Sequence, residues 1–293
     1  MQTKPYGTSG FDVSILGLGA GQVGDERLSE QEAALLLNTA LDLGLTLIDT
    51  ARGYGLSEER IGRHLAHRRS EFVLSTKVGY GIPGHADWSG GIIEAGVDAA
   101  LARLRTDRLD IVHLHSCELP TLQAGEVVDA LERARDKGKI RVAAYSGENE
   151  ALRWALASGR FGGVECSVNL FDQGVLDGPL VRARQDGLGV IAKRPLGNAP
   201  WRFDARPVGD YAETYWERLR ELAYDTSGLA WDEFALRFSA WQPEVSCAIV
   251  GTASVAHLKH NAAIAANGPL PADVAAAVRR RFAECGAAWT GQV

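Results

Sequence analysis

Four residues with acid–base side chains stand at or just after the ends of short apolar runs. They are Asp49, Tyr54, Lys77 and His115. A tyrosine phenol has a pKa of about 10, so at neutral pH it is a weak proton donor until a neighbouring cation stabilises its phenolate. Lys77 could supply that cation and Asp49 could balance the lysine charge. His115 could then orient a carbonyl oxygen or carry its proton, so the set indicates proton transfer to or from a carbonyl or an alcohol.

Other chemistry is open to some of these residues, and each has an ordinary structural role when it is considered alone. Lys77 could form a Schiff base in an aldolase-like barrel, since a desolvated amine is a good nucleophile. His113 and His115 form an H-x-H pair on one strand face, a spacing that some metal hydrolases use. Beyond them the later strand ends offer only Glu165 as a ligand. We therefore predict no metal, and we interpret His113 as a packed interior residue.

A glycine-rich segment, GAGQVG at residues 19–24, follows the first apolar run. Its G-x-G-x-x-G spacing matches a dinucleotide-binding fingerprint when it joins a strand to a helix. That interpretation requires a doubly wound sheet, which usually has about six strands. We interpret the glycines instead as a flexible loop that borders the pocket, with Gly19 against the substrate.

The elements that must position these side chains alternate along the whole chain. Short runs rich in Val, Ile and Leu are separated by longer amphipathic segments, which is typical of parallel βα units. Helix starts are marked at Ser29, with Glu32 completing a capping box, at Ser57 and at Ser254. The predicted strands span residues 14–19, 45–49, 72–77, 109–115, 139–146, 163–169, 188–193 and 245–250.

Eight such units predict a closed (β/α)8 barrel, the TIM-barrel architecture, as a single domain over residues 1–293. The reactive groups of such barrels gather at the carboxyl ends of the strands. Three segments break the rhythm. We expect a short N-terminal hairpin with its turn at the TSG sequence, a long functional loop over residues 194–228, and a C-terminal helix over residues 271–285 outside the barrel.

Composition narrows the function further. Hydrophobic residues make up 46% of the chain and the net charge is −6, with no long basic block, so neither nucleic acid nor an anionic membrane is an expected partner. The N-terminus has no apolar signal region, and no stretch is long enough to cross a bilayer. The four cysteines form no C-x-x-C pair, which fits a reducing compartment. We expect a soluble, cytoplasmic protein.

Three sequence blocks give a specific resemblance. DTARGYG at residues 49–55, STK at residues 75–77 and LDIVHLHS at residues 109–116 resemble the signature blocks of the aldo-keto reductases, in order and at the family's spacing. The resemblance covers nearly the whole chain. It implies that Tyr54 is the general acid and base and that His115 aligns the substrate. It also implies that Lys77 and Asp49 tune the tyrosine.

The same resemblance implies a nicotinamide cofactor, NADPH by family habit and NADH as an alternative. The nicotinamide would lie near Ser146, and three positions depart from the family. Gly147 stands where an Asn is common, Glu165 where a Gln is common, and Lys193 where a Tyr stacks on the ring. Lys193 and Arg194 could instead reach a phosphate.

IVGTASVAHLKHN, at residues 249–261, resembles the family's adenosine-binding segment, where backbone N–H groups at a helix start hold the 2′-phosphate end. His257 falls where members selective for NADP often carry Arg. The predicted contacts of this segment are Gly251, Thr252, Ser254, His257 and Asn261.

Taken together, the sequence predicts an oxidoreductase that moves hydride between a nicotinamide dinucleotide and a small carbonyl compound, alcohol or sugar. Trp88 and Trp201 could line an apolar substrate pocket or serve only in packing. Besides the Schiff-base aldolase, a cofactor-binding sensor without turnover is an alternative, motivated by the three altered positions. We expect a monomer or a small homo-oligomer.

Overall fold

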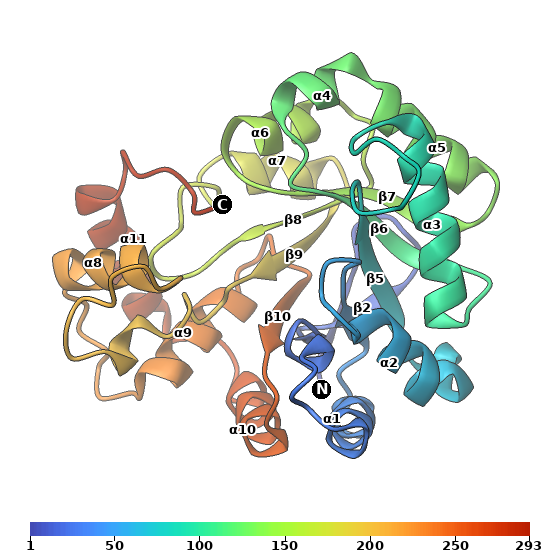
Figure 1. Cartoon of the computed structure of the whole chain (residues 1–293). Helices are drawn as coiled ribbons and strands as arrows, with labels where there is room; N and C mark the ends of the chain where they lie inside the picture. The colour runs from blue at the N-terminus through green and yellow to red at the C-terminus, as the bar shows by residue number, and fades with distance from the viewer.

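The computed structural model describes residues 1–293, and its centre is a closed barrel of eight parallel strands (Figure 1). The strands follow one another around the barrel in chain order, and the last pairs with the first. This confirms the predicted (β/α)8 barrel. The barrel strands are β3 (Leu16–Gly19), β4 (Leu47–Asp49), β5 (Val73–Val78), β6 (Leu109–His115), β7 (Ile140–Ser146), β8 (Gly163–Ser167), β9 (Gly189–Lys193) and β10 (Cys247–Gly251).

Helices surround the barrel and bury one face against it. The Ser29 hydroxyl accepts from the Glu32 backbone and the Glu32 side chain accepts in return, so the predicted capping box is present. The Ser254 hydroxyl accepts from the His257 backbone at the start of its helix, without a returning side-chain bond. Ser57 is the first helical residue, and its hydroxyl donates to the Ala20 carbonyl. The helices are α1 (Glu30–Asp42), α2 (Ser57–Leu65), α3 (Gly90–Leu104), α4 (Leu119–Ala124), α5 (Glu126–Asp136), α6 (Asn149–Ala157), α7 (Pro179–Gln185), α8 (Glu213–Leu222), α9 (Trp231–Ala240), α10 (Val255–Ala266) and α11 (Ala272–Cys285).

The amino-terminal end of the barrel is plugged by the predicted hairpin, in which β1 (Thr3–Pro5) pairs antiparallel with β2 (Asp12–Ser14). Tyr6 lies in the connection between these two strands and is fully buried in the small core cluster inside the barrel. A Cβ on Gly163 or Gly189 would lie only 2.2 or 2.4 Å from the Tyr6 side chain, so glycine at these strand starts makes room for the ring. The opposite end, where the strands terminate, is the end that can hold a site.

Of the two other predicted irregularities, the C-terminal helix is present, whereas the segment 194–228 is not a continuous loop. The segment 194–228 carries a short 3-10 helix, η3 (Pro200–Arg202), and helix α8. Helix α11 lies outside the barrel beside α8 (Figure 1). None of the helices is both long and apolar enough to cross a membrane.

Candidate active site

A cavity of about 840 Å³ lies at the carboxyl ends of the barrel strands. It is large enough for a small-molecule ligand or cofactor, since such pockets usually measure about 300–1,000 Å³. Residues from the first and last strands meet residues from the middle strands there. The lining includes these predicted site residues: Gly19, Asp49, Tyr54, His115, Ser146, Glu165, Lys193, Arg194 and Gly251.

Lys77 lies beneath the cavity floor, with its side chain fully buried. Its ammonium donates to the Asp49 carboxylate and, at 3.1 Å, to the Thr50 carbonyl oxygen, and it lies 3.3 Å from the Oε2 atom of Glu165. Burial alone would lower the pKa of Lys77, but the two carboxylates outweigh it and raise that pKa well above its usual value. Lys77 is therefore a permanent cation at this site.

Tyr54 stands over this cation, with the Lys77 ammonium 5.2 Å from the centroid of its ring. The ammonium acts to lower the pKa of Tyr54, but burial and the carboxylates of Asp49 and Glu165 outweigh it and raise that pKa above its usual value. The phenol is thus protonated at neutral pH. Gly24 holds the tyrosine loop closely, because a Cβ there would lie 1.6 Å from the Tyr54 carbonyl oxygen.

His115 faces Tyr54 edge-on across the cavity, with 5.9 Å between ring centroids. Its Nδ1 atom lies 2.7 Å from the Tyr80 hydroxyl. Burial, with the Lys77 ammonium, lowers the pKa of His115 to about 3, so the imidazole is neutral. When Tyr80 donates to Nδ1, the proton of the neutral ring resides on Nε2, which can then donate to a ligand oxygen.

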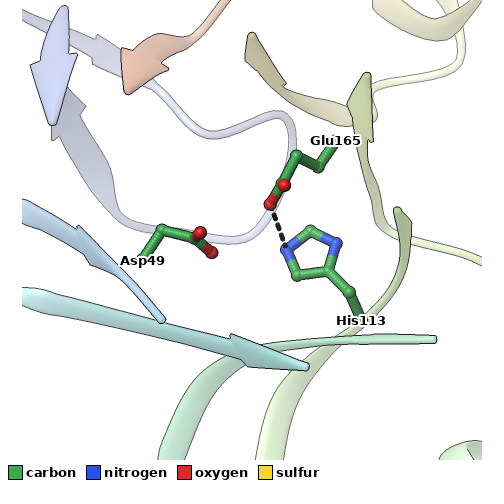
Figure 2. Close-up of side chains that lie close together, drawn as sticks. All are labelled: Asp49, His113 and Glu165. Atoms are coloured by element: carbon green, nitrogen blue, oxygen red, sulfur yellow. Dashed lines mark ion pairs between the residues drawn. The ribbon is translucent and has the colours of Figure 1, made fainter. Parts of the chain in front are cut away.

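Asp49 and Glu165, which line the cavity, lie close to the buried side chain of His113. One ligand atom each of Asp49, His113 and Glu165 falls within 4.8 Å of the others (Figure 2). Their spacing would suit a metal ion, but the Lys77 ammonium contacts both carboxylates and already supplies the cation. His113 is fully buried and its Nε2 atom lies 3.1 Å from the Ser75 hydroxyl. It lies in the interior, as the sequence indicated.

The pKa values of the two carboxyl groups around Lys77 shift in opposite directions, because the two groups share one ammonium. Burial, together with the neighbouring Glu165 carboxylate, raises the pKa of Asp49 to about 7. Burial also acts against ionisation of Glu165, but the Lys77 ammonium overcomes it and lowers that pKa to about 2. Glu165 is therefore ionised at neutral pH, and Asp49 is the group that takes up a proton.

Of the three positions that depart from the family, Glu165 and Lys193 line the cavity, and Gly147 follows Ser146, which lines it. Glu165 accepts a hydrogen bond from the Ser146 hydroxyl at 3.3 Å, while its Oε2 atom faces the Lys77 ammonium. Lys193 lies 3.2 Å from Glu148, a buried carboxylate that also accepts from the backbone and hydroxyl of Ser167, both at 2.8 Å. Gly147 packs against Tyr145, where a Cβ would lie 2.2 Å from the phenolic oxygen.

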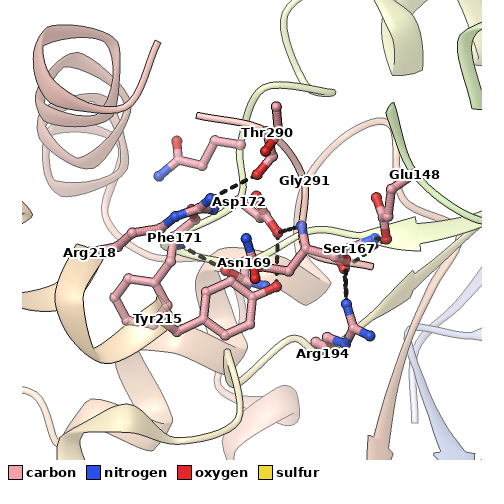
Figure 3. Close-up of polar contacts among 12 residues, drawn as sticks. Glu148, Ser167, Asn169, Phe171, Asp172, Arg194, Tyr215, Arg218, Thr290 and Gly291 are labelled. Carbon is pink, nitrogen blue, oxygen red and sulfur yellow. Dashed lines mark hydrogen bonds and ion pairs between the residues drawn. The ribbon is translucent and has the colours of Figure 1, made fainter. Parts of the chain in front are cut away.

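The C-terminal tail closes the same wall (Figure 3). Arg218 donates to the Thr290 carbonyl at 2.7 Å, and the Gly291 amide donates to Asn149 at 2.8 Å. Arg194 contacts Ser167 at 3.3 Å and donates to the Gln292 carbonyl. The tail thus fixes Arg194 at the cavity rim.

The predicted adenosine-binding segment reaches the cavity at its first three residues, Ile249, Val250 and Gly251. Gly251 lines it, and a Cβ there would lie 2.4 Å from the Gln22 side chain. Ser254 accepts from the His257 backbone at 3.3 Å, and Thr252 accepts from the Ser254 backbone at 3.0 Å. These contacts order the start of α10. Asn261 is buried on the same helix. The cavity lining includes none of the other four predicted contacts, which are Thr252, Ser254, His257 and Asn261.

The two tryptophans proposed for substrate contact also lie away from the lining. Trp88 packs against Gly79 and Tyr80, and Trp201 stacks on Trp231 with ring centroids 5.9 Å apart. Their role in substrate binding stays a prediction. Tyr80 and Glu148 were missed by sequence reasoning, although Tyr80 follows Lys77 by only three residues.

Comparison with known proteins shows the family of this chain. A sequence model of the Aldo/keto reductase family matches residues 15–281, so the chain belongs to that family of oxidoreductases. It is 27% identical to L-galactose dehydrogenase from Arabidopsis thaliana, over 90% of this chain and 88% of the relative. D-threo-aldose 1-dehydrogenase from a Pseudomonas species is also 27% identical, over 90% of this chain and 93% of that protein.

Solved structures show the same architecture. A putative aldo-keto reductase from Pseudomonas aeruginosa superposes with a TM-score of 0.72 at 31% identity, covering 90% of this chain and 94% of its own. The holo form of an aldo-keto reductase from Bacillus halodurans gives a TM-score of 0.83 at 24% identity, covering 98% of this chain and 97% of its own, a likeness of fold.

Proposed function

We propose that this protein is a nicotinamide-dependent oxidoreductase that interconverts a small carbonyl compound and the corresponding alcohol or sugar, with Tyr54 as the general acid and base. The observation that carries the proposal is the Lys77 ammonium beneath the Tyr54 ring, at the floor of a cavity that His115 also lines. A protonated phenol and a neutral imidazole thus face the same space. That arrangement suits proton transfer to a developing alkoxide.

Each side chain would contribute a distinct function. The His115 ring would donate a hydrogen bond to the substrate oxygen and hold it beside the phenol. Tyr54 would give its proton to that oxygen during reduction and take it back during oxidation. Lys77 stabilises the phenolate that is left behind, and Asp49 fixes the position of the lysine.

The cavity also fits a nicotinamide dinucleotide. The Glu165 carboxylate lines the cavity and offers an acceptor to a carboxamide N–H, and the cavity runs to Gly251 just before the start of α10. Ser146, Glu165 and Lys193 would hold the nicotinamide end, and Arg194 with the start of α10 would hold the phosphates. When bound, the reduced cofactor supplies a hydride. We propose NADPH, with NADH as the alternative.

The names of the relatives suggest the substrate class. L-galactose dehydrogenase and D-threo-aldose 1-dehydrogenase are both named for oxidation of sugars. We propose that the substrate of this chain is likewise a sugar or a small polar carbonyl compound. A cavity lined by Arg202, Asp210 and Asn198 beside Tyr211 offers hydroxyl groups many partners.

The Schiff-base alternative is disfavoured by the protonation of Lys77. An amine must lose its proton to attack a carbonyl, and two buried carboxylates hold this one in its charged form. A sensor without turnover remains distinguishable by experiment, because it would bind the cofactor and leave every carbonyl substrate unchanged.

The test combines equilibrium binding of NADPH and NADH with turnover of a panel of aldoses and small aldehydes. We expect wild type to oxidise at least one of the two cofactors, and Tyr54→Phe to lose nearly all turnover while its cofactor affinity stays within about threefold. Tyr145→Phe is a matched control, because its hydroxyl bonds the Cys117 carbonyl away from the cavity. Binding without turnover in wild type would favour the sensor, and unchanged turnover in Tyr54→Phe would refute the assignment.

A further inference from the structure

We propose that Glu165 makes the cavity bind the oxidised, positively charged form of the nicotinamide cofactor in preference to the reduced, neutral form. This preference would favour oxidation of an alcohol or sugar as the working direction. The inference rests on the proposed function and assigns a role to the carboxylate that stands where a glutamine is common.

The position of Glu165 is that of a ligand-facing group. It is 2% exposed, and it lines the same cavity as Tyr54 and His115. Its Oε1 atom accepts from the Ser146 hydroxyl, and its Oε2 atom lies 3.3 Å from the Lys77 ammonium, which Asp49 also contacts. A carboxylate in the cavity lining that shares its counter-charge with a second carboxylate is suited to a ligand that brings a positive charge.

Glu165 is also the source of an excess negative charge. Two carboxylates, Asp49 and Glu165, share the single ammonium of Lys77. His113 lies 3.8 Å from Glu165, but burial lowers its pKa to about 4, so it carries no compensating charge. When both carboxylates are ionised, the cluster has a net charge of −1. A glutamine at position 165 would leave the cluster neutral.

The other cations of the cavity lining lie beside carboxylates of their own or at the rim, and Arg202 faces Asp210 with 3.8 Å between the charged groups. Lys193 is engaged by Glu148, with 3.2 Å between the ammonium and the carboxylate. Arg194 contacts the Ser167 hydroxyl and the Gln292 carbonyl at the rim, where it is suited to an anionic phosphate. His115 is held neutral by burial, which lowers its pKa to about 3.

A cationic ring in this cavity would therefore gain an attraction that the neutral ring lacks. Within a partly desolvated site, one unit charge a few ångströms away changes affinity by at least about tenfold. The enzyme leaves the equilibrium constant of its reaction unchanged. Tighter binding of the oxidised form nevertheless raises the fraction of enzyme that is loaded for oxidation at a given ratio of the two cofactor forms.

The experiment measures dissociation constants of NADP⁺ and NADPH by calorimetry at pH 8, without substrate. We expect wild type to bind NADP⁺ at least as tightly as NADPH. Glu165→Gln keeps the shape and the Ser146 contact, and should shift the ratio of the two constants by about tenfold or more towards NADPH. Glu165→Asp keeps the charge and should keep the preference. Glu150→Gln removes a carboxylate that is 74% exposed and should leave the ratio unchanged.

Each outcome decides the inference. A ratio that is the same in Glu165→Gln as in wild type overturns it, and so does a wild type that prefers NADPH by tenfold. If Glu165→Gln does not fold, the wild-type preference and its persistence in Glu165→Asp decide. Failure of wild type to bind either form refutes the proposed function itself, a result distinct from binding of both forms without the preference.

Discussion

Replacing Lys77 by methionine should destabilise the folded protein by about 3 kcal/mol near neutral pH. Methionine fills a similar volume but removes the ammonium that contacts Asp49 and Glu165. The Lys77 ammonium holds the pKa of Glu165 well below that of a free glutamate, and removing one partner of a buried ion pair costs about 3–5 kcal/mol.

The loss should also depend on pH. The folded-state pKa of Glu165 is depressed, so its stabilisation in wild type is fully present above about pH 4.3 and is lost only as the pH falls towards 2. In the variant, burial and mutual repulsion raise the pKa of both carboxyls above their unfolded values. The variant therefore regains stability as these carboxyls take up protons. Its loss of unfolding free energy relative to wild type should be smaller at pH 5 than at pH 7.

Urea unfolding followed by circular dichroism at pH 7 and pH 5 measures both effects. Lys139→Met is the matched control, because Lys139 pairs with Asp98 at the surface and such pairs contribute at most about 1 kcal/mol. The double variant Lys77→Met with Glu165→Gln should recover part of the loss. A Lys77→Met protein within 1 kcal/mol of wild type at pH 7, or one whose deficit is the same at both pH values, would refute this account of the cluster.

Three further predictions concern the same site. Tyr80→Phe removes the hydroxyl bonded to His115 and should lower kcat/KM by about tenfold with unchanged cofactor affinity, as measured by steady-state kinetics and titration. The preference for oxidised over reduced cofactor should rise with pH through about 7, as Asp49 loses its proton and the cluster becomes negative; calorimetry at pH 6 and pH 8 measures it. Gly24→Ala should displace the Tyr54 loop and cost about 1–3 kcal/mol of stability, measured by urea unfolding.

Each of these predictions has an opposing result. Cofactor affinity that falls together with kcat/KM in Tyr80→Phe would mean that the hydroxyl supports the cofactor rather than the imidazole. If the preference for oxidised over reduced cofactor did not change with pH, Asp49 would not be the group whose protonation controls it. Gly174→Ala is the control for Gly24→Ala, because a Cβ at Gly174 meets nothing within 4 Å; equal losses in the two would contradict the packing argument.

The barrel could be predicted because its strands are buried on both faces and so form continuous apolar runs between amphipathic helices. The predicted first residues of the strands were less accurate than the predicted barrel. The second strand was expected from Leu45 but begins at Leu47, because the Leu45 amide bonds the Ala40 carbonyl at 3.0 Å and belongs to the end of α1. Apolar residues at a helix end and at a strand start look alike in a sequence.

The candidate site was predictable to the extent that strand ends determine it. Asp49, Lys77 and His115 end neighbouring strands, so their meeting follows from the barrel. The contact between Tyr80 and His115 depends on a loop conformation that no periodic pattern encodes. The hydrogen bond between Asn149 and Gly291 joins residues 142 positions apart, which only the folded chain brings together.

The central claim is hydride transfer assisted by Tyr54, and isotope transfer tests it most directly. Wild type is supplied with an aldehyde and NADPH carrying deuterium at the transferable C4 position, and the alcohol is analysed by mass spectrometry. We predict one deuterium on the carbinol carbon, and at most a trace of alcohol from Tyr54→Phe. An alcohol that carries no deuterium from the cofactor, or equal yields from the two proteins, would contradict the account.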